Sequence, residues 1–138
     1  MKFSKRIVSL MLAAMMVMAM SLTAFAAPSV KMYGYMNGEY KESNHTAAFI
    51  GSVVDEGDGE YTIQFVKAKV YGQEGYIASM TINGTTFTAN PLTGAMTVNF
   101  DYNPTVEVTD GVYGQAISYA VNVSDSTHPN STGALVIQ

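Results

Sequence analysis

The chain has 138 residues, of which 48% are apolar and 13% are charged, and it contains no cysteine. Disulfide bonds are therefore excluded, and the length allows a single domain with one core. Beyond residue 26, four lysines stand against eleven acidic residues, which makes a net charge of −7. This charge argues against binding to nucleic acid or to an anionic membrane, because phosphate contacts need clustered lysine and arginine.

Residues 1–26 have the pattern of a secretory signal peptide. Three basic residues precede an apolar stretch from Ile7 to about Met20, and Ala24-Phe25-Ala26 offers small residues where signal peptidase cleaves. We expect cleavage after Ala26, a mature domain over 27–138 without membrane contact, and a secreted, extracellular or cell-envelope location. The alternative is a retained membrane anchor, since the apolar stretch is nearly long enough to span a bilayer.

The mature chain is rich in Val, Ile, Thr, Tyr and Phe, the residues that suit a pleated strand surface. No window has the i, i+3, i+4, i+7 apolar spacing of an amphipathic helix. Asn37-Gly38 and Asn83-Gly84 each separate two alternating runs and predict type I′ hairpin turns. The apolar runs predict strands over 30–36, 39–43, 47–54, 60–70, 76–82, 85–89, 95–102, 105–109, 115–123 and 134–138, with a polar loop at 124–133.

Short strands joined by tight turns predict an all-β fold. We expect a single antiparallel up-and-down barrel of about eight strands, with a β-sandwich as the alternative. Because side chains alternate between the faces of a strand, each run also predicts a core face. The predicted core residues are Phe49, Ile50, Ile63, Phe65, Tyr76, Ala78, Met80, Ile82, Met96, Val98, Phe100, Tyr102, Ile117, Tyr119, Val121 and Val123.

The stretch VVDEGDGEYTIQF, residues 53–65, places four acidic residues and two glycines in six consecutive positions. An EF-hand loop needs oxygen ligands at positions 1, 3 and 5, glycine at 6 and an acid at 12. With the second glycine at position 6, the apolar residues Val54 and Phe65 fall at positions 1 and 12, so the match fails at both ends. We interpret the stretch as an exposed hairpin tip. The alternative is a weak Ca²⁺ contact through Asp55, Glu56 and Asp58.

Nine tyrosines are the other candidate binding residues. Tyrosine has a large apolar face and a polar tip, so it suits both binding surfaces and packing between strands. Tyr33 and Tyr35 are expected to share one face as an exposed aromatic pair, and Tyr76 and Tyr119 complete the candidate ligand-binding set. The chain has only two histidines and no G-x-S-x-G motif, so we expect no enzymatic activity and no catalytic residues. No cofactor is implied beyond the Ca²⁺ alternative.

Three segments carry a family resemblance. Residues 59–65 (GEYTIQF), followed by Gly75-Tyr76-Ile77 and Met80-Thr81-Ile82, resemble the calycin-like, lipocalin-type β-barrel domains of small secreted bacterial proteins. The resemblance covers residues 37–138 and rests on strand and turn residues. It implies an eight-stranded barrel that has room for a ligand cavity, and it specifies no ligand.

Two functions follow as hypotheses. The first is a secreted barrel that binds a small apolar or amphipathic ligand in its interior or mouth. The alternative is an extracellular interaction module that recognises a protein or a glycan through surface tyrosines. The interior distinguishes them, because a cavity ligand is not expected if large side chains fill the centre of the barrel. The side chains in question are Phe49, Ile63, Phe65, Phe100 and Tyr119.

Overall fold

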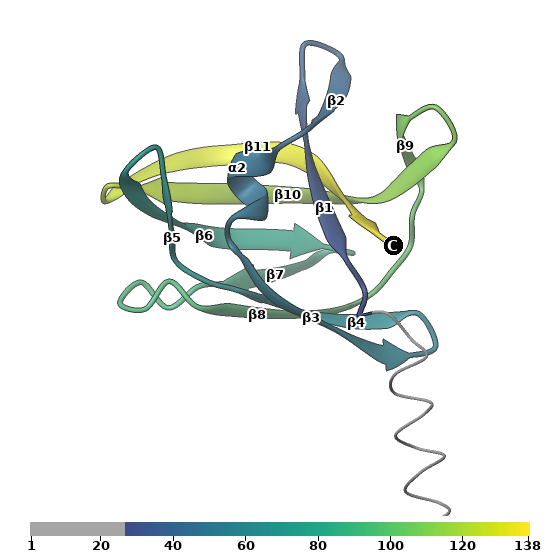
Figure 1. Cartoon of the computed structure of the whole chain (residues 1–138), viewed down its shortest axis with the longest axis horizontal. Coiled ribbons are helices and arrows are strands. Elements are labelled where there is room, and N and C mark those ends of the chain that lie inside the picture. The colour runs from purple at the N-terminus through teal and green to yellow at the C-terminus, as the bar shows by residue number, and fades with distance from the viewer. Residues whose placement is uncertain (1–26) are drawn as a thin grey trace, which may run out of the picture.

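The computed structural model describes residues 27–138, so the predicted signal peptide at 1–26 lies outside the described residues. The predicted all-β antiparallel fold is confirmed (Figure 1). The strands are β1 Val30–Met36, β2 Glu39–Glu42, β3 Ile50–Gly57, β4 Glu60–Phe65, β5 Ala68–Val70, β6 Gln73–Ile82, β7 Thr85–Thr88, β8 Met96–Asp101, β9 Val106–Thr109, β10 Val112–Val123 and β11 Ser126–Ile137. In this part of the chain no helix is long and apolar enough to cross a membrane.

The strands form two sheets. The large sheet has eight strands in the order β2-β1-β11-β10-β6-β5, with β7 added beside β6 and β9 beside β10. It curls into a half-barrel, and the three-stranded sheet β3-β4-β8 lies across its open side (Figure 1). Pairing of β1 with β11, from Val30 opposite Ile137 to Gly34 opposite Gly133, joins the two ends of the described part of the chain. The barrel is therefore built from two sheets whose facing edges do not all pair.

The core lies between the two sheets. The small sheet contributes Ile63, Phe65, Val98 and Phe100, and the large sheet contributes Met32, Ile77, Met80, Ile82, Ile117 and Leu135. The strict alternation of buried and exposed residues along β8 matches the predicted core face, with Met96, Val98 and Phe100 turned inward. Burial of these apolar side chains stabilises the domain, since no disulfide is available.

The hairpin turns form where the sequence predicts them. Asn37 and Gly38 have φ of 55° and 81°, and Asn83 and Gly84 have 51° and 77°, as a type I′ turn requires. The acidic stretch turns in the same way at Asp58, between β3 and β4, which confirms its interpretation as a hairpin tip.

Two predicted strands differ from the structure in their bounds. The strand predicted over 47–54 begins only at Ile50, because a short helix, α2 Asn44–Ala47, forms first. Its N-cap is Ser43, whose hydroxyl accepts a hydrogen bond from the Thr46 amide at 3.4 Å. The single strand predicted over 60–70 is two strands, β4 and β5, which belong to different sheets. The chain therefore crosses from the small sheet to the large one in the middle of an apolar run.

The loop predicted at 124–133 was also wrong. Ser124 and Asp125 form a tight turn with φ of 50° and 62°, and Ser126–Ile137 is one continuous strand. The first half of this strand pairs only with β10, because β1 joins β11 no earlier than Gly133. The first half of β11 is therefore an edge strand beside β10, and backbone pairing along an edge needs no apolar side chains, so the polar composition does not prevent a strand.

The core face predicted for 76–82 is wrong at its first half. The register between β6 and β10 shifts between Ala120 and Val121, so that Val121 lies opposite Ile77 and Ala120 opposite Ser79. The extra residue, Ala78, makes a β-bulge, which reverses the alternation of side chains along β6. As a result Ile77 is completely buried beside Met80, whereas Tyr76 and Ala78 are only half-buried.

Candidate functional site

Large side chains fill the centre of the barrel. Phe65, Ile63 and Phe49 are at most 2% exposed, and Phe100 and Tyr119 are 6% and 7% exposed. All five belong to one continuous hydrophobic cluster. Open depressions of about 280 to 320 Å³ lie on the surface, one of them over Lys67, Ala68, Lys69 and Glu74.

The four tyrosines predicted as ligand-binding residues do not form one site. Tyr119 lies in the core, where its ring faces Gly34 and Gly133. Burial raises the pKa of its hydroxyl, and a hydrogen bond with Ser131 partly opposes that rise. Tyr76 is half-buried on β6, with the Lys67 amine 5.8 Å from its ring centre. In the large sheet β11 and β10 separate β6 from β1, so Tyr76 lies apart from Tyr33 and Tyr35.

Tyr33 and Tyr35 lie on one face of β1, as predicted, but only Tyr35 is exposed, and the ring that it contacts is that of the half-buried Tyr40. Tyr35 stands directly opposite Tyr40 of β2, and their ring centres are 4.9 Å apart with the planes tilted by 57°. Tyr33 is half-buried and 45% of Tyr35 is exposed. Tyr33, Tyr35 and Tyr40 together make the tyrosine patch on the outer face of the β1–β2 hairpin.

A second, smaller hydrophobic cluster supports the tyrosine patch from below. Val108 of β9 packs with Ala134 and Val136 of β11, and Tyr33 and Tyr40 pack against them. Ala134 lies opposite Tyr33 in the β1–β11 register, so both share the outer face of the sheet. The β9–β10 hairpin therefore folds against the base of the β1–β2 hairpin, and both project from the same end of the molecule (Figure 1).

The polar surroundings of the tyrosine patch are mixed in charge. Lys31 and Glu42 are exposed on the same face, and on the opposite face of β2 Lys41 forms an exposed ion pair with Glu39 at 3.5 Å. On the neighbouring hairpin, Tyr113 is 50% exposed, and a hydrogen bond to Glu107 raises the pKa of its hydroxyl. An aromatic centre with a mixed polar rim is the usual composition of a protein-binding surface.

The acidic residues of the β3–β4 hairpin point into solvent. Asp55, Glu56 and Asp58 are all exposed, and the Asp55 carboxylate accepts a hydrogen bond from the Gly57 amide at 2.9 Å. Within residues 27–138 there is no group of three His, Cys, Asp or Glu side chains that could hold a metal ion. This hydrogen bond lies within the hairpin tip, so the Asp55 carboxylate oxygen stabilises the turn.

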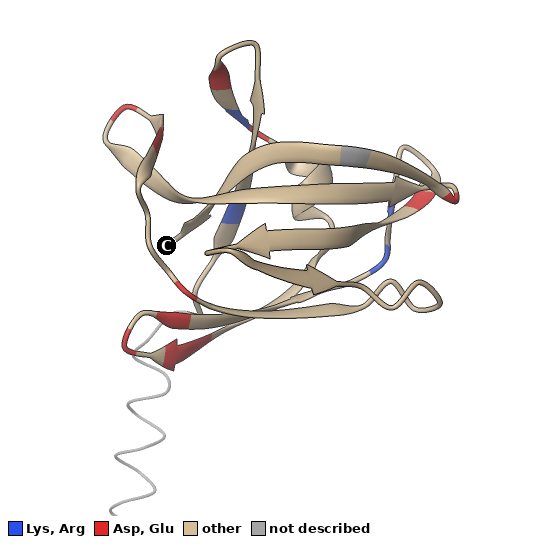
Figure 2. Cartoon of the chain, turned by 180° about the vertical axis from the view of Figure 1, so that it is seen from behind, with Lys and Arg blue, Asp and Glu red and all other residues tan. Residues whose placement is uncertain are grey.

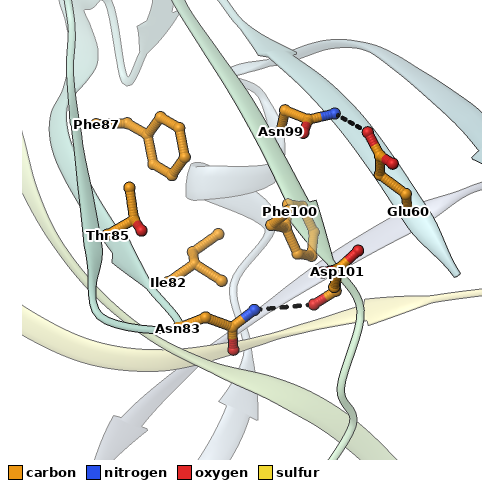
Figure 3. A pocket seen from close by; sticks show the side chains of 8 residues that line it. All are labelled: Glu60, Ile82, Asn83, Thr85, Phe87, Asn99, Phe100 and Asp101. Atoms are coloured by element: carbon orange, nitrogen blue, oxygen red, sulfur yellow. Dashed lines mark hydrogen bonds between the residues drawn. The ribbon is translucent and has the colours of Figure 1, made fainter.

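A second depression lies between β7 and β8, at the seam of the two sheets (Figure 3). It measures about 280 Å³, and we call it the edge notch. Thr85 and Phe87 form one side, Asn99 and Asp101 form the other, and Ile82 and Phe100 lie between them. At one end the Asn83 side-chain amide donates a hydrogen bond to the Asp101 carbonyl oxygen at 2.9 Å.

Side-chain amides hold the walls of the edge notch. The Asn99 amide donates to the Glu60 carboxylate at 2.9 Å and to the Thr62 hydroxyl at 2.8 Å. The buried amide of Gln115 donates to the Asn83 side-chain oxygen at 3.1 Å, which orients Asn83 toward β8. These bonds fix the two sides of the notch relative to the core.

Two features of these sites were missed from the sequence. Tyr40 could have been found, because a two-residue turn at Asn37-Gly38 requires Tyr35 and Tyr40 to face each other. The edge notch could not, since it depends on strands from two different sheets. Comparison of the chain with protein-family models, curated proteins and solved structures finds no match, so the calycin-like resemblance rests on the sequence pattern alone.

Proposed function

We propose that the mature chain is an extracellular protein-interaction module that binds a partner protein through the tyrosine patch. The observation that carries the proposal is the geometry of Tyr35, which is 45% exposed and yet held 4.9 Å from the ring of Tyr40. A tyrosine held in this way offers a large contact area and loses little conformational entropy on binding.

Two observations favour a protein over the other ligands considered from the sequence. The filled core leaves little room for an apolar small molecule, which usually needs an enclosed pocket of roughly 300–1,000 Å³. The rings of Tyr35 and Tyr40 are tilted by 57° and so do not offer one flat platform for a sugar chain. A protein surface with its own side chains is better able to fit such a stepped aromatic face.

Photo-cross-linking tests the proposal in cells that secrete the chain. The photoreactive residue p-benzoylphenylalanine replaces Tyr35, and in a matched control it replaces Leu92, which is 86% exposed on a different loop. We expect position 35 to give a discrete adduct with one protein and position 92 to give none. Adding Tyr40→Ala should weaken the adduct, because Tyr40 holds the ring at position 35.

The affinity for the captured partner then measures the contribution of the patch. Tyr35→Ala is expected to cost at least about 2 kcal/mol of binding free energy, or roughly a 30-fold loss in affinity. The proposal is contradicted if cross-linking from position 92 gives the same protein adduct as cross-linking from position 35. It is also contradicted if Tyr35→Ala leaves the affinity for the partner unchanged. Native mass spectrometry of the secreted chain distinguishes this proposal from the alternative of a ligand-binding barrel. A small molecule retained by the protein would favour the ligand-binding barrel.

A further inference from the structure

The edge notch lies between two strands that each have one free edge. In the described part of the chain β7 pairs only with β6, and β8 pairs only with β4. The two strands contact each other across the seam without forming a ladder (Figure 1). A free strand edge presents unpaired backbone donors and acceptors, which is the template that an added strand needs.

The register identifies the backbone groups on these free edges. The Tyr102 amide donates to the Gly59 carbonyl at 2.8 Å, so the bonded positions of β8 alternate from there through Phe100, Val98 and Met96. Thr97, Asn99 and Asp101 consequently direct their amides and carbonyls away from β4. The Asp101 carbonyl is the one that Asn83 already caps, which agrees with this direction.

The same argument applies to β7. The Ala89 amide donates to the Ala78 carbonyl at 2.9 Å, and two-residue alternation from that pair bonds Phe87 and Thr85 to β6. Thr86 and Thr88 therefore direct their backbone groups toward the seam. Asn99 and Asp101 of β8 line the notch, so a segment that enters it meets backbone partners on the free edge of β8, with Thr85 and Phe87 of β7 as the opposite wall.

The charge at this end of the molecule specifies the partner. Glu60 and Asp101 both border the notch and stand directly opposite each other on β4 and β8. Like charges in that position destabilise a sheet, and a cation placed beside them relieves the repulsion. More acidic residues gather on the neighbouring β3–β4 hairpin (Figure 2), and the ion pairs of the described residues, Lys41–Glu39 and Lys67–Glu74, lie elsewhere.

We propose that the edge notch binds an extended peptide segment rich in lysine or arginine from another protein, which adds as a strand to the free edge of β8. The amides and carbonyls of Thr97 and Asn99 pair with the segment, and its basic side chains lie beside Glu60 and Asp101. Apolar side chains on its other face lie against Phe87 and Phe100 at the floor of the notch. Asn83 releases the Asp101 carbonyl, which then pairs with the segment as well.

The test uses the mature chain and the acetylated, amidated hexapeptide of alternating lysine and valine as the probe. Titration followed by ¹H–¹⁵N NMR should shift the amides of Thr97 and Asn99, and hydrogen exchange at both should slow in the complex. The hexapeptide of alternating glutamate and valine should not bind. Equal binding of both peptides, or shifts restricted to the β3–β4 tip without slower exchange on β8, would overturn the proposal.

A proline variant and its matched control locate the contact. Thr97→Pro removes an amide that points away from β4, so the β4–β8 ladder stays intact, and we expect binding of the probe to weaken about tenfold or more. Thr97→Ala keeps the amide and should bind like the wild-type chain. If Thr97→Pro fails to fold, the wild-type chain is titrated with the probe peptide N-methylated at alternate residues. N-methylation removes the peptide amides that would pair with β8, so binding should weaken. Unchanged affinity in both experiments would refute strand addition.

Discussion

Replacing Gly133 by alanine is expected to destabilise the domain, because β11 passes very close to β1 at this point. A Cβ on Gly133 would overlap the backbone carbonyl oxygen of Tyr33 and would approach Cε1 of Tyr119 to 3.1 Å. The carbonyl belongs to a paired strand, so it cannot move without disturbing the β1–β11 ladder. Overpacking of this kind lowers the free energy of unfolding by about 1–3 kcal/mol. Because the overlapping atom belongs to the backbone, we expect a loss of about 2 kcal/mol. For a domain of this size that loss lowers the melting temperature by about 8 °C.

Gly34 provides a matched control, since it lies directly opposite Gly133 in the same ladder. The nearest atom to a Cβ on Gly34 is the Tyr119 hydroxyl oxygen at 3.8 Å, an ordinary contact distance. Alanine there restricts the unfolded chain and should stabilise the domain by about 0.5–1 kcal/mol. Urea and thermal unfolding of residues 27–138, followed by circular dichroism, measure both effects. If the two variants change the free energy of unfolding equally, the close approach at Gly133 is not what controls stability.

Three further predictions concern the core, the buried hydroxyl and the patch. Phe65→Ala should cost about 3–5 kcal/mol of unfolding free energy in urea, because the side chain is completely buried. Burial raises the pKa of Tyr119 in the folded state, so the free energy of unfolding should fall as the pH rises above the usual tyrosine pKa of about 10. Tyr119→Phe should make that fall less steep. Urea unfolding at several pH values between neutral and alkaline measures the difference. Tyr35→Ala should change the free energy of unfolding by no more than about 0.5 kcal/mol, because Tyr35 is exposed and its side chain acts in binding.

These outcomes separate folding from recognition. Variants at Phe65 and Tyr119 act on the core and should leave the tyrosine patch intact in the chains that fold, whereas Gly133→Ala also presses on the backbone of Tyr33 in the patch. Variants at Tyr35 and Thr97 act on surfaces and should leave the unfolding transition nearly unchanged. A surface variant that lowers both stability and binding would show that its side chain supports the fold instead.

The sequence by itself determined the features that depend on neighbouring residues. Asn37-Gly38 and Asn83-Gly84 turn the chain as predicted, because positive φ at two consecutive residues is a local requirement. The alternation along β8 predicted its core face for the same reason, since side chains on one strand alternate whatever the strand pairs with. These local signals were enough for the fold class and for about half of the buried residues, among them Ile63, Phe65 and Val98.

Only the tertiary structure decided the features that depend on pairing between distant strands. The bulge at Ala78 forms against β10, so the reversal of faces that buries Ile77 has no signal within β6 itself. The polar strand that precedes Gly133 is held by backbone hydrogen bonds, which carry no hydrophobic pattern. The free edges of β7 and β8 arise because the chain divides its strands between two sheets, and that division is set by long-range contacts across the core.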